Sequence, residues 1–263
     1  MQAAEIDYQV FKRRICSRTG LDLSAYKQAQ MERRLRTLME RSGARSFVNY
    51  YQMLDRDEQL MTEFMNRVTI NVTEFFRNPD HYAILEKKVI PELLRRSSQL
   101  RTWSAACSYG HEPHSLAICL QEAMLKTGHT ILATDIDDKS LASGRKGQFP
   151  ASDAKNMPAE RISRWFKREG DFLIAHQKLR DMMEFRKLDL LKDRFPVDMD
   201  LILCRNVVIY FTEEAKDDLY ARFFRALKPG GYLFVGGTER INNHAEIGYL
   251  SPYPFYYQRP PKQ

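Results

Sequence analysis

The sequence predicts an α/β fold with a parallel sheet, preceded by a small all-helical module. First, short apolar segments alternate with helical patterns from about residue 80, and these segments are LRTWSAA (100–106), TILATDI (130–136), MDLILC (199–204) and YLFVGG (232–237). Strands that alternate with long helical patterns are joined by right-handed crossovers, which gives a parallel sheet covered on both faces. Second, the first seventy residues carry only helical patterns. Two domains are therefore expected, at 1–70 and 71–263.

The helical module rests on amphipathic periodicity. In SAYKQAQMERRLRTLMERSG (24–43), Ser24 is a candidate N-cap, Gly43 is a candidate stop, and apolar residues recur at helical spacing, namely Met31, Leu35, Leu38 and Met39. A second amphipathic run, DEQLMTEFMNRVT, starts at Asp57.

Helices of the α/β part are expected in EPHSLAICLQEAMLK, DKSLASGRK and TEEAKDDLYARFFRALK, between the strands. The segment from Phe166 to Met182 lacks a helical period and predicts a small β-hairpin insertion. The last segment, HAEIGYLSPYPFYYQRP, is aromatic and predicts antiparallel strands at a sheet edge, without a helix.

The net charge of +7 is concentrated near the start of the chain. Residues 11 to 45 contain ten lysines and arginines against three acidic residues. Of these, Lys27, Arg34 and Arg41 lie seven apart along one edge of the apolar stripe. This pattern favours a negatively charged partner, either nucleic acid or an acidic protein surface, although most basic amphipathic helices only present a solvated face.

No run of eighteen or more apolar residues occurs, and the first residues, MQAAEIDYQVFKRR, lack the apolar region of a signal peptide. The four cysteines are scattered without a CxxC pair, which favours buried thiols over a disulfide framework or a zinc site. A cytoplasmic monomer that does not insert into membranes is expected.

Ligands of an open parallel sheet bind beyond the carboxyl ends of its strands. The first strand is followed by a turn with a single glycine, Gly110, and no lysine, which does not suit a phosphate. Asp135 ends the second strand, about where a carboxylate binds ribose hydroxyls in nucleoside-binding sheets. A ribose without a phosphate cradle points to S-adenosylmethionine. An N-cap for the following helix is the alternative role of Asp135.

Two further strands end in polar residues. Asp189 follows MEFRKL and can accept a hydrogen bond from an adenine amine, and Asn206 follows LILC inside the expected cleft. Tyr210 lies one short turn later and would overhang the same cleft, where its phenol can face the methyl acceptor. Alternatively, Tyr210 and Phe211 are plain core aromatics.

A family resemblance is carried by five segments in order, INVTEFFRN, WSAACSYGHEP, ATDID, CRNVVIYF and LKPGGYLFVGGTE. Together they closely resemble the CheR family of chemotaxis receptor methyltransferases, and the match extends over nearly the whole chain. The resemblance implies a Rossmann-like, seven-stranded, mostly parallel sheet that binds S-adenosylmethionine, with a β-hairpin subdomain inserted near 166–183.

The resemblance also implies an activity, the transfer of a methyl group to glutamate side chains on the cytoplasmic domain of methyl-accepting chemoreceptors. It leaves S-adenosylhomocysteine as product and involves neither metal nor nucleic acid. Arg77 and Tyr210 would face the reacting centre, and the basic helix edge at Lys27, Arg34 and Arg41 would dock the receptor. By matching position, the cofactor-binding residues would be Asn71, Thr73, Arg77, Glu112, Asp135, Asp189, Leu190, Asn206 and Val207.

The sequence departs from the family in the first turn, where SYGHEPHS stands for the usual STGEEPYS. This departure motivates an alternative function, a degenerate CheR-like module that binds receptor or nucleotide without catalysis. A third hypothesis is an RNA methyltransferase, against which the lack of an NPPY-type turn after the fourth strand argues. His111 and His114 flank Glu112 but lack further ligands nearby in sequence, so a metal site is not expected. Arg77 has two alternative, purely structural roles, which are to cap a helix or to extend to the surface.

Overall fold

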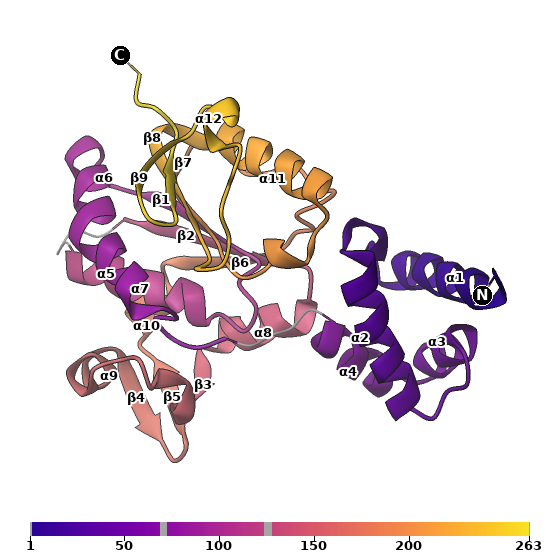
Figure 1. The fold of residues 1–263 in the computed structure, drawn as a ribbon. Coiled ribbons are helices and arrows are strands. Elements are labelled where there is room, and N and C mark those ends of the chain that lie inside the picture. The colour runs from indigo at the N-terminus through magenta and orange to yellow at the C-terminus, as the bar shows by residue number, and fades with distance from the viewer. Residues whose placement is uncertain (1, 69–72, 124–127, 263) are drawn as a thin grey trace. The chain divides into compact units, whose positions relative to one another are not determined.

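The computed structural model describes residues 2–68, 73–123 and 128–262 (Figure 1). Its contacts divide the chain into two compact units. The first, called the helical unit below, comprises Met1–Asn71 together with Tyr210–Lys216, and the second, called the sheet unit, comprises Val72–Ile209 and Asp217–Gln263.

The helical unit forms around a cluster of aromatic side chains. Phe11 of the first helix stacks on Tyr50 of the third at 5.9 Å and meets Phe64 of the fourth edge-on at 5.9 Å, and all three are buried. Such ring pairs add to the free energy gained by burying apolar area. The elements are α1 (Gln2–Thr19), η1 (Leu23–Ala25), α2 (Gln28–Arg41), α3 (Phe47–Arg56) and α4 (Glu58–Val68).

The start of α2 differs from the expectation. Ser24 is not its N-cap, because the Ser24 backbone N–H and hydroxyl both donate to Oδ1 of Asp22, at 2.9 and 2.6 Å. These bonds close the 3₁₀ turn η1 instead, and α2 begins only after Lys27, whose carbonyl accepts the Met31 N–H at 3.0 Å. Gly43 follows the end of α2 with φ of 78°, as a helix stop requires.

The short segment Tyr210–Lys216 groups with the helical unit although it is far from it in sequence. The Lys27 N–H donates to the Tyr210 carbonyl and the Thr212 N–H to the Ala25 carbonyl, both at 2.9 Å. The rings of Tyr26 and Phe211 pack edge to face at 5.1 Å. Phe211 is buried, so the interpretation as a core aromatic is correct for this residue.

The sheet unit is built on a 7-stranded sheet in the order β6-β2-β1-β7-β8-β10-β9. The first five strands in this order pair in parallel, and β10 runs antiparallel to β8 and β9. This confirms the predicted mostly parallel sheet. The strands are β1 (Arg101–Ala105), β2 (Thr130–Asp135), β6 (Met183–Lys187), β7 (Met199–Cys204), β8 (Leu227–Val235), β9 (Leu250–Tyr253) and β10 (Tyr256–Gln258).

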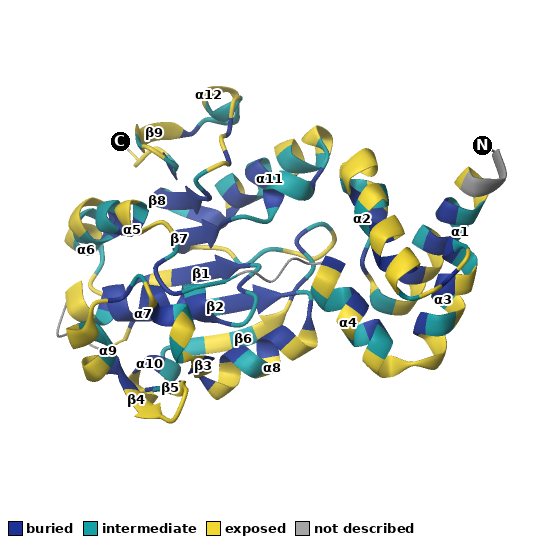
Figure 2. Cartoon of the chain, turned by 60° about the horizontal axis from the view of Figure 1, so that its bottom comes forward, coloured by how far each residue is buried: buried dark blue, intermediate teal, exposed yellow. Residues whose placement is uncertain are grey.

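Helices cover both faces of this sheet. Side chains of adjacent residues in a strand point to opposite faces. On β1, Trp103 packs on Phe223 of one helix at 5.3 Å, whereas Ser104 donates to Glu112 of another at 2.7 Å. The central strands β1 and β7 are accordingly almost fully buried (Figure 2). The helical elements around the sheet are α5 (Pro79–Ile84), the π-helical turn η2 (Leu85–Val89), α6 (Ile90–Arg96), α7 (His111–Ala123), α8 (Asp138–Lys146), η4 (Val208–Tyr210) and α11 (Glu213–Ala226).

A separate small sheet lies between α8 and β6 in the chain. The expected hairpin is present as β4 (Phe166–Glu169) and β5 (Phe172–Ala175), and β3 (Gln148–Pro150) adds a third antiparallel strand that the sequence pattern did not indicate. Three short elements complete this insertion, namely η3 (Ala151–Ala154), α9 (Ala159–Trp165) and α10 (Gln177–Arg180).

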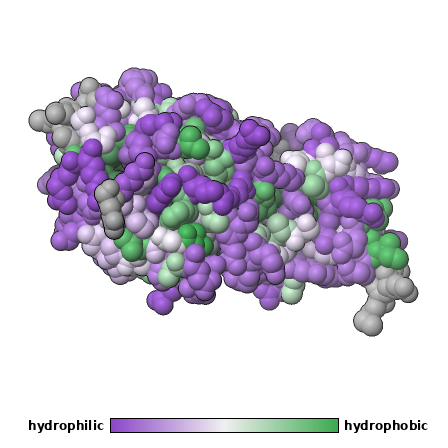
Figure 3. All heavy atoms as spheres, turned by 90° about the horizontal axis from the view of Figure 1, so that it is seen from above, coloured by the Kyte–Doolittle hydropathy of each residue, from purple (hydrophilic) through white to green (hydrophobic). Residues whose placement is uncertain are grey.

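The end of the chain forms the two expected antiparallel strands, but the prediction of no helix was wrong. A short helix, α12 (His244–Ile247), precedes β9 and ends at Gly248, whose φ is 103°. Hydrophilic side chains cover most of the face drawn in Figure 3, and hydrophobic ones gather there only in small patches. Within the described ranges, no helix combines the length and apolar character needed to cross a bilayer.

Candidate functional site

The candidate site lies at the carboxyl ends of four neighbouring strands. In the order β6-β2-β1-β7, these strands are followed or ended by Asp189, by Asp135, by the turn that leads to Glu112, and by Asn206. Parallel strands present their carboxyl ends at one edge of the sheet. The fold therefore gathers at one edge four polar side chains that are scattered in the sequence.

The turn after β1 has an unusual backbone. Ala106 and Ser108 adopt left-handed φ values of 61° and 48°, which non-glycine residues rarely do. Gly110 follows with φ of 90°, and a Cβ atom there would lie 2.8 Å from the Gly144 Cα of α8. A side chain at position 110 would therefore push the turn away from α8, which explains the single glycine.

Asp135 ties this turn to the end of β2. Its Oδ2 accepts the Ser108 N–H at 2.8 Å and its Oδ1 accepts the Asp137 N–H at 3.0 Å. Burial raises the pKa of Asp135 to about 6, although these backbone N–H groups favour the ionised form. The residue that caps α8 is Asp137, which accepts from Lys139 and Ser140. The alternative role of Asp135 as a helix cap is therefore wrong.

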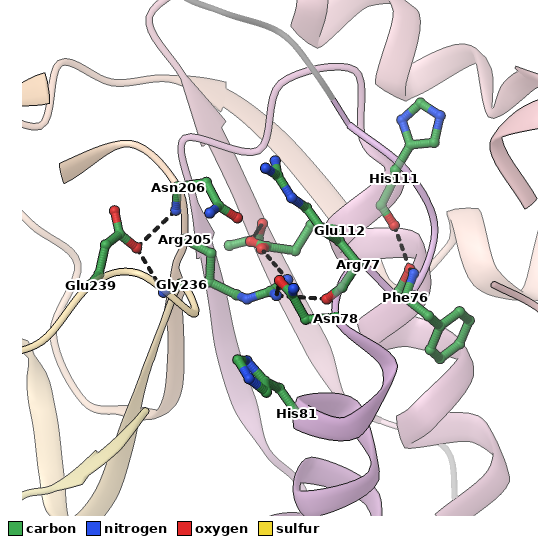
Figure 4. Close-up of polar contacts among 12 residues, drawn as sticks. Phe76, Arg77, Asn78, His81, His111, Glu112, Arg205, Asn206, Gly236 and Glu239 are labelled. Carbon is green, nitrogen blue, oxygen red and sulfur yellow. Dashed lines mark hydrogen bonds and ion pairs between the residues drawn. The ribbon is translucent and has the colours of Figure 1, made fainter. Parts of the chain in front are cut away.

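A buried ion pair joins α7 to the loop after β7 (Figure 4). Arg205 Nη1 lies 3.5 Å from Glu112 Oε2, and the Arg205 side chain is only 2% exposed. Its guanidinium lies over the rings of Phe234 and Tyr82, at 4.5 and 5.3 Å from their centroids. Burial raises the pKa of Glu112, whereas Arg205 and the Ser104 hydroxyl lower it. Arg205 thus offsets the desolvation of the Glu112 carboxylate.

The linker segment before α5 is anchored in the same network. The Phe76 N–H donates to Ser115 Oγ at 3.0 Å, and Arg205 Nη2 donates to the Arg77 carbonyl at 2.6 Å and to Asn78 Oδ1 at 3.0 Å. Arg77 is half-buried, and its backbone is thereby fixed beside Arg205. Asn78 occupies the N-cap position of α5, so Arg77 is not its cap.

Of the other two linker residues expected to bind cofactor, Thr73 is half-buried and Asn71 lies outside the described residues.

Asp189 and Leu190 lie in the loop after β6. Asp189 Oδ1 accepts the Leu191 N–H at 2.9 Å, and its own N–H donates to Asp193 at 2.8 Å. Arg222 of α11 donates to the Leu190 carbonyl at 2.6 Å. These bonds fix the loop, and the second Asp189 oxygen lies 3.8 Å from the Lys192 ammonium.

Asn206 and Val207 are both half-buried and follow β7 directly. Asn206 has a left-handed φ of 61°, and its side-chain amide points away from Glu239 and toward the Glu112 side of the site (Figure 4). The backbone of this loop is held by Glu239, a buried residue that follows β8.

The remaining predicted residues belong to the helical unit. Tyr210 is half-buried and hydrogen-bonds to Arg34 of α2, and burial lowers the pKa of Arg34. Lys27 and Arg41 are exposed at the two ends of α2, and the Lys27 ammonium lies 3.6 Å from Glu213. Among the described residues, the cofactor candidates from Thr73 to Val207 thus belong to the sheet unit, and the three docking candidates belong to the helical unit.

The two histidines of the unusual turn point into the core. His111 Nε2 lies 2.8 Å from Asp153 Oδ2, and His114 Nδ1 lies 2.7 Å from the Gly110 carbonyl. Both rings pack on Phe149, at 4.7 and 4.8 Å. Burial lowers the pKa of both, that of His114 to about 4, so both are neutral at neutral pH. No group of three or more potential metal ligands occurs in the part of the chain that the structure describes.

Sequence reasoning assigned no role to Arg205 or Glu239. The sequence did contain a signal for each residue. Arg205 is a charged residue directly after an apolar strand that is fully buried, and Glu239 follows a buried strand and two glycines. Charged residues are rarely buried unless they are paired, but the sequence does not reveal which partners they find.

Two family models match almost the whole chain. The model described as the SAM binding domain of CheR methyltransferases matches residues 71–254, and the one described as their all-alpha domain matches residues 6–69. A chemotaxis protein methyltransferase of Listeria innocua is 39% identical over 96% of this chain and 97% of the relative. Chemotaxis protein methyltransferase 1 of Pseudomonas aeruginosa is 34% identical, with 96% and 97% coverage. A chemotaxis protein methyltransferase of Salmonella typhimurium is 35% identical over 88% of this chain and 84% of the relative.

Proposed function

This chain belongs to the CheR methyltransferase family of S-adenosylmethionine-dependent enzymes, and we propose that it methylates glutamate side chains on the cytoplasmic helices of a chemoreceptor. The product would be a glutamyl methyl ester. The observation that carries this proposal is the gathering of Glu112, Asp135 and Asn206 at one sheet edge, with Arg77 tied to that edge through Arg205.

The chemistry of this edge fits S-adenosylmethionine. Asp135 Oδ2 accepts the Ser108 N–H and Oδ1 the Asp137 N–H, and the two carboxylate oxygens keep lone-pair capacity for ribose hydroxyls. Asp189 and Leu190 would flank the adenine, and Glu112 and the Asn206–Val207 pair would bind the polar groups of the cofactor. Thr73 and Arg77 would reach it from the linker, as would Asn71. When bound, the cofactor supplies a methyl group activated by its positively charged sulfur.

The protein therefore has to align the acceptor carboxylate with the methyl group, and it does not have to remove a proton from it. A glutamate carboxylate is already ionised at neutral pH, so no general base is needed. Arg77 would hold that carboxylate by charge-assisted hydrogen bonds, and Tyr210 would fix its orientation by one more. Alignment and exclusion of water are the contributions that remain for the protein.

The receptor would bind through the basic edge of α2. Lys27, Arg34 and Arg41 give this edge a positive charge, and receptor methylation helices carry several glutamates. Opposite charges of this kind accelerate encounter and make it sensitive to salt. Membership of the CheR methyltransferase family favours an acidic protein surface over nucleic acid as the partner of the basic segment.

The test is transfer of labelled methyl groups from S-adenosylmethionine to a cytoplasmic chemoreceptor fragment. We expect incorporation that is released by mild alkali, as methyl esters are, and that disappears when the fragment's glutamates are changed to alanine. Arg77→Ala should reduce incorporation strongly.

Two alternative functions predict other results. Binding of S-adenosylhomocysteine without incorporation into the fragment would favour a receptor-binding module without catalysis. Incorporation into RNA in place of the fragment would favour an RNA methyltransferase. Either result would overturn the proposed substrate. The core positions of His111 and His114 argue against the first alternative, because the altered turn still presents Glu112 to Arg205.

A further inference from the structure

Glu239 carries a buried carboxylate that the site described above does not use for binding. The residue is 3% exposed and follows β8. Its Oε2 accepts the backbone N–H groups of Asn206 at 2.8 Å and Gly236 at 2.7 Å. Its Oε1 accepts those of Val208 at 2.9 Å and Ile209 at 3.3 Å. One side chain thus satisfies four backbone donors.

The four donors come from the loops after two neighbouring strands. β7 and β8 pair in parallel up to Cys204 and Val235, so the two loops leave the sheet side by side. Beyond this point the strands no longer satisfy each other's backbone groups. Buried backbone N–H groups need an acceptor, and a carboxylate with two oxygens can accept all four. Glu239 therefore sets the path of the loop that carries Asn206.

This path includes a residue with a left-handed backbone. Asn206 adopts a φ of 61°, a conformation that asparagine accepts more readily than most other non-glycine residues. The bond from its N–H to Glu239 lies on one side of the backbone, and its amide side chain points to the other, toward Glu112 (Figure 4). Movement of the Glu239 carboxylate would therefore redirect the Asn206 amide.

We propose that Glu239 is a positioning residue of the cofactor site, which holds Asn206 and Val207 in the geometry that binds S-adenosylmethionine. The inference rests on the proposed role of the Asn206–Val207 pair. Gly236 supports it, because a Cβ atom at this position would lie 2.5 Å from Glu239 Oε2 and 2.9 Å from the Asn206 nitrogen. The carboxylate is thus enclosed by the two loops that it joins.

The first experiment measures S-adenosylhomocysteine binding by calorimetry for Glu239→Gln. The amide keeps the size of the side chain but faces two N–H groups with its own donor, so two of the four bonds are lost. We expect the Kd to rise about tenfold or more, since an unpaired buried donor costs as much as a tenfold change in an equilibrium. In methyl transfer, the KM for S-adenosylmethionine should rise and the KM for the receptor fragment should stay within about twofold.

Glu92→Gln is the matched control. Glu92 is a mostly buried glutamate of the same unit that accepts bonds from Tyr232 at 2.7 Å and Gln258 at 3.0 Å, away from the strand ends that form the site. The Glu92→Gln variant should have a lower melting temperature and an unchanged Kd for S-adenosylhomocysteine. A folded Glu239→Gln protein with the Kd of the wild type would overturn the proposal, as would equal Kd changes in both variants.

Glu239→Asp keeps the charge but draws both oxygens back by one methylene, away from the four N–H groups, and should also raise the Kd. It decides the question if Glu239→Gln does not fold, and if neither variant folds, Glu239 is only structural and the proposal fails. In a double-mutant cycle, Glu239→Gln should weaken binding less in an Asn206→Ala background than in the wild type, and additive effects would contradict action through Asn206. Because these readouts need only S-adenosylhomocysteine, they stand apart from the receptor assay that tests the proposed function.

Discussion

Arg205 and Glu112 form an ion pair at 3.5 Å that connects the loop after β7 to helix α7 inside the sheet unit. The same guanidinium binds the carbonyl of Arg77 and the side chain of Asn78. A single buried cation therefore fixes three separate segments around the edge where the cofactor is proposed to bind.

Removal of this cation should destabilise the fold. Arg205→Met leaves Glu112 buried without its partner, which costs roughly 3–5 kcal/mol in the free energy of unfolding. The double variant Arg205→Met with Glu112→Gln should recover part of this loss, because no buried charge is left unpaired. Urea unfolding followed by circular dichroism measures both. Arg186→Met is the control, since its ion pair with Glu184 is exposed and should contribute at most about 1 kcal/mol. Equal losses for Arg205→Met and the double variant would contradict the pairing.

Asp135 should make cofactor binding depend on pH. Its pKa is about 6, and only the ionised carboxylate can accept both ribose hydroxyls without donating a proton of its own. We expect the affinity for S-adenosylhomocysteine to fall as the pH drops through about 6, by as much as about tenfold per unit well below it. Calorimetry between pH 5 and 8 measures this.

The stability of the free protein should follow the opposite trend. Because burial raises the pKa of Asp135 above its ordinary value of 3.8, the folded state binds the proton more tightly than the unfolded state does. The contribution of Asp135 to the free energy of unfolding is fully present below about pH 3.8 and is lost as the pH rises through about 6. Asp135→Asn should flatten both profiles, and an unchanged affinity profile in this variant would assign the titration to another group.

Tyr210 should affect methyl transfer and leave cofactor binding unchanged. Tyr210→Phe removes only the hydroxyl, which hydrogen-bonds to Arg34 and is proposed to orient the acceptor carboxylate. We expect kcat to fall roughly tenfold to a hundredfold, the effect of one hydrogen bond to a charged group. The Kd of S-adenosylhomocysteine should stay within about twofold. Tyr51→Phe is the control, because it removes a tyrosine bond to Asp55 within the same unit. A full kcat in Tyr210→Phe would remove this residue from the mechanism.

Charge reversal on α2 should weaken docking of the receptor. Arg41→Glu inverts an exposed charge on the proposed edge, so the KM for the receptor fragment should rise several-fold and its salt dependence should weaken. Arg33→Glu makes the same change on the same helix but away from that edge. Methyl transfer measured from 50 to 300 mM salt separates them. Similar KM values for the two variants would show that only overall charge matters.

The sequence by itself determined the class of fold and most of its elements. Alternation of apolar strands with helices predicted the parallel sheet, and β7 spans Met199–Cys204 as its pattern indicated. These signals are local, because each strand or helix shows its period within its own residues. The same holds for Asp135, Asp189 and Asn206, since a residue at the end of a predicted parallel strand must lie at the ligand edge.

The tertiary structure alone decided how that edge is held. Arg205 binds Arg77 from 128 positions away, and Glu239 binds Asn206 from 33 positions away. No periodicity reports such pairs, because the partner of a buried charge is chosen by the packing of the whole domain. The third strand of the small sheet and the grouping of Tyr210 with the helical unit were hidden for the same reason, since both depend on contacts between segments that are distant in the chain.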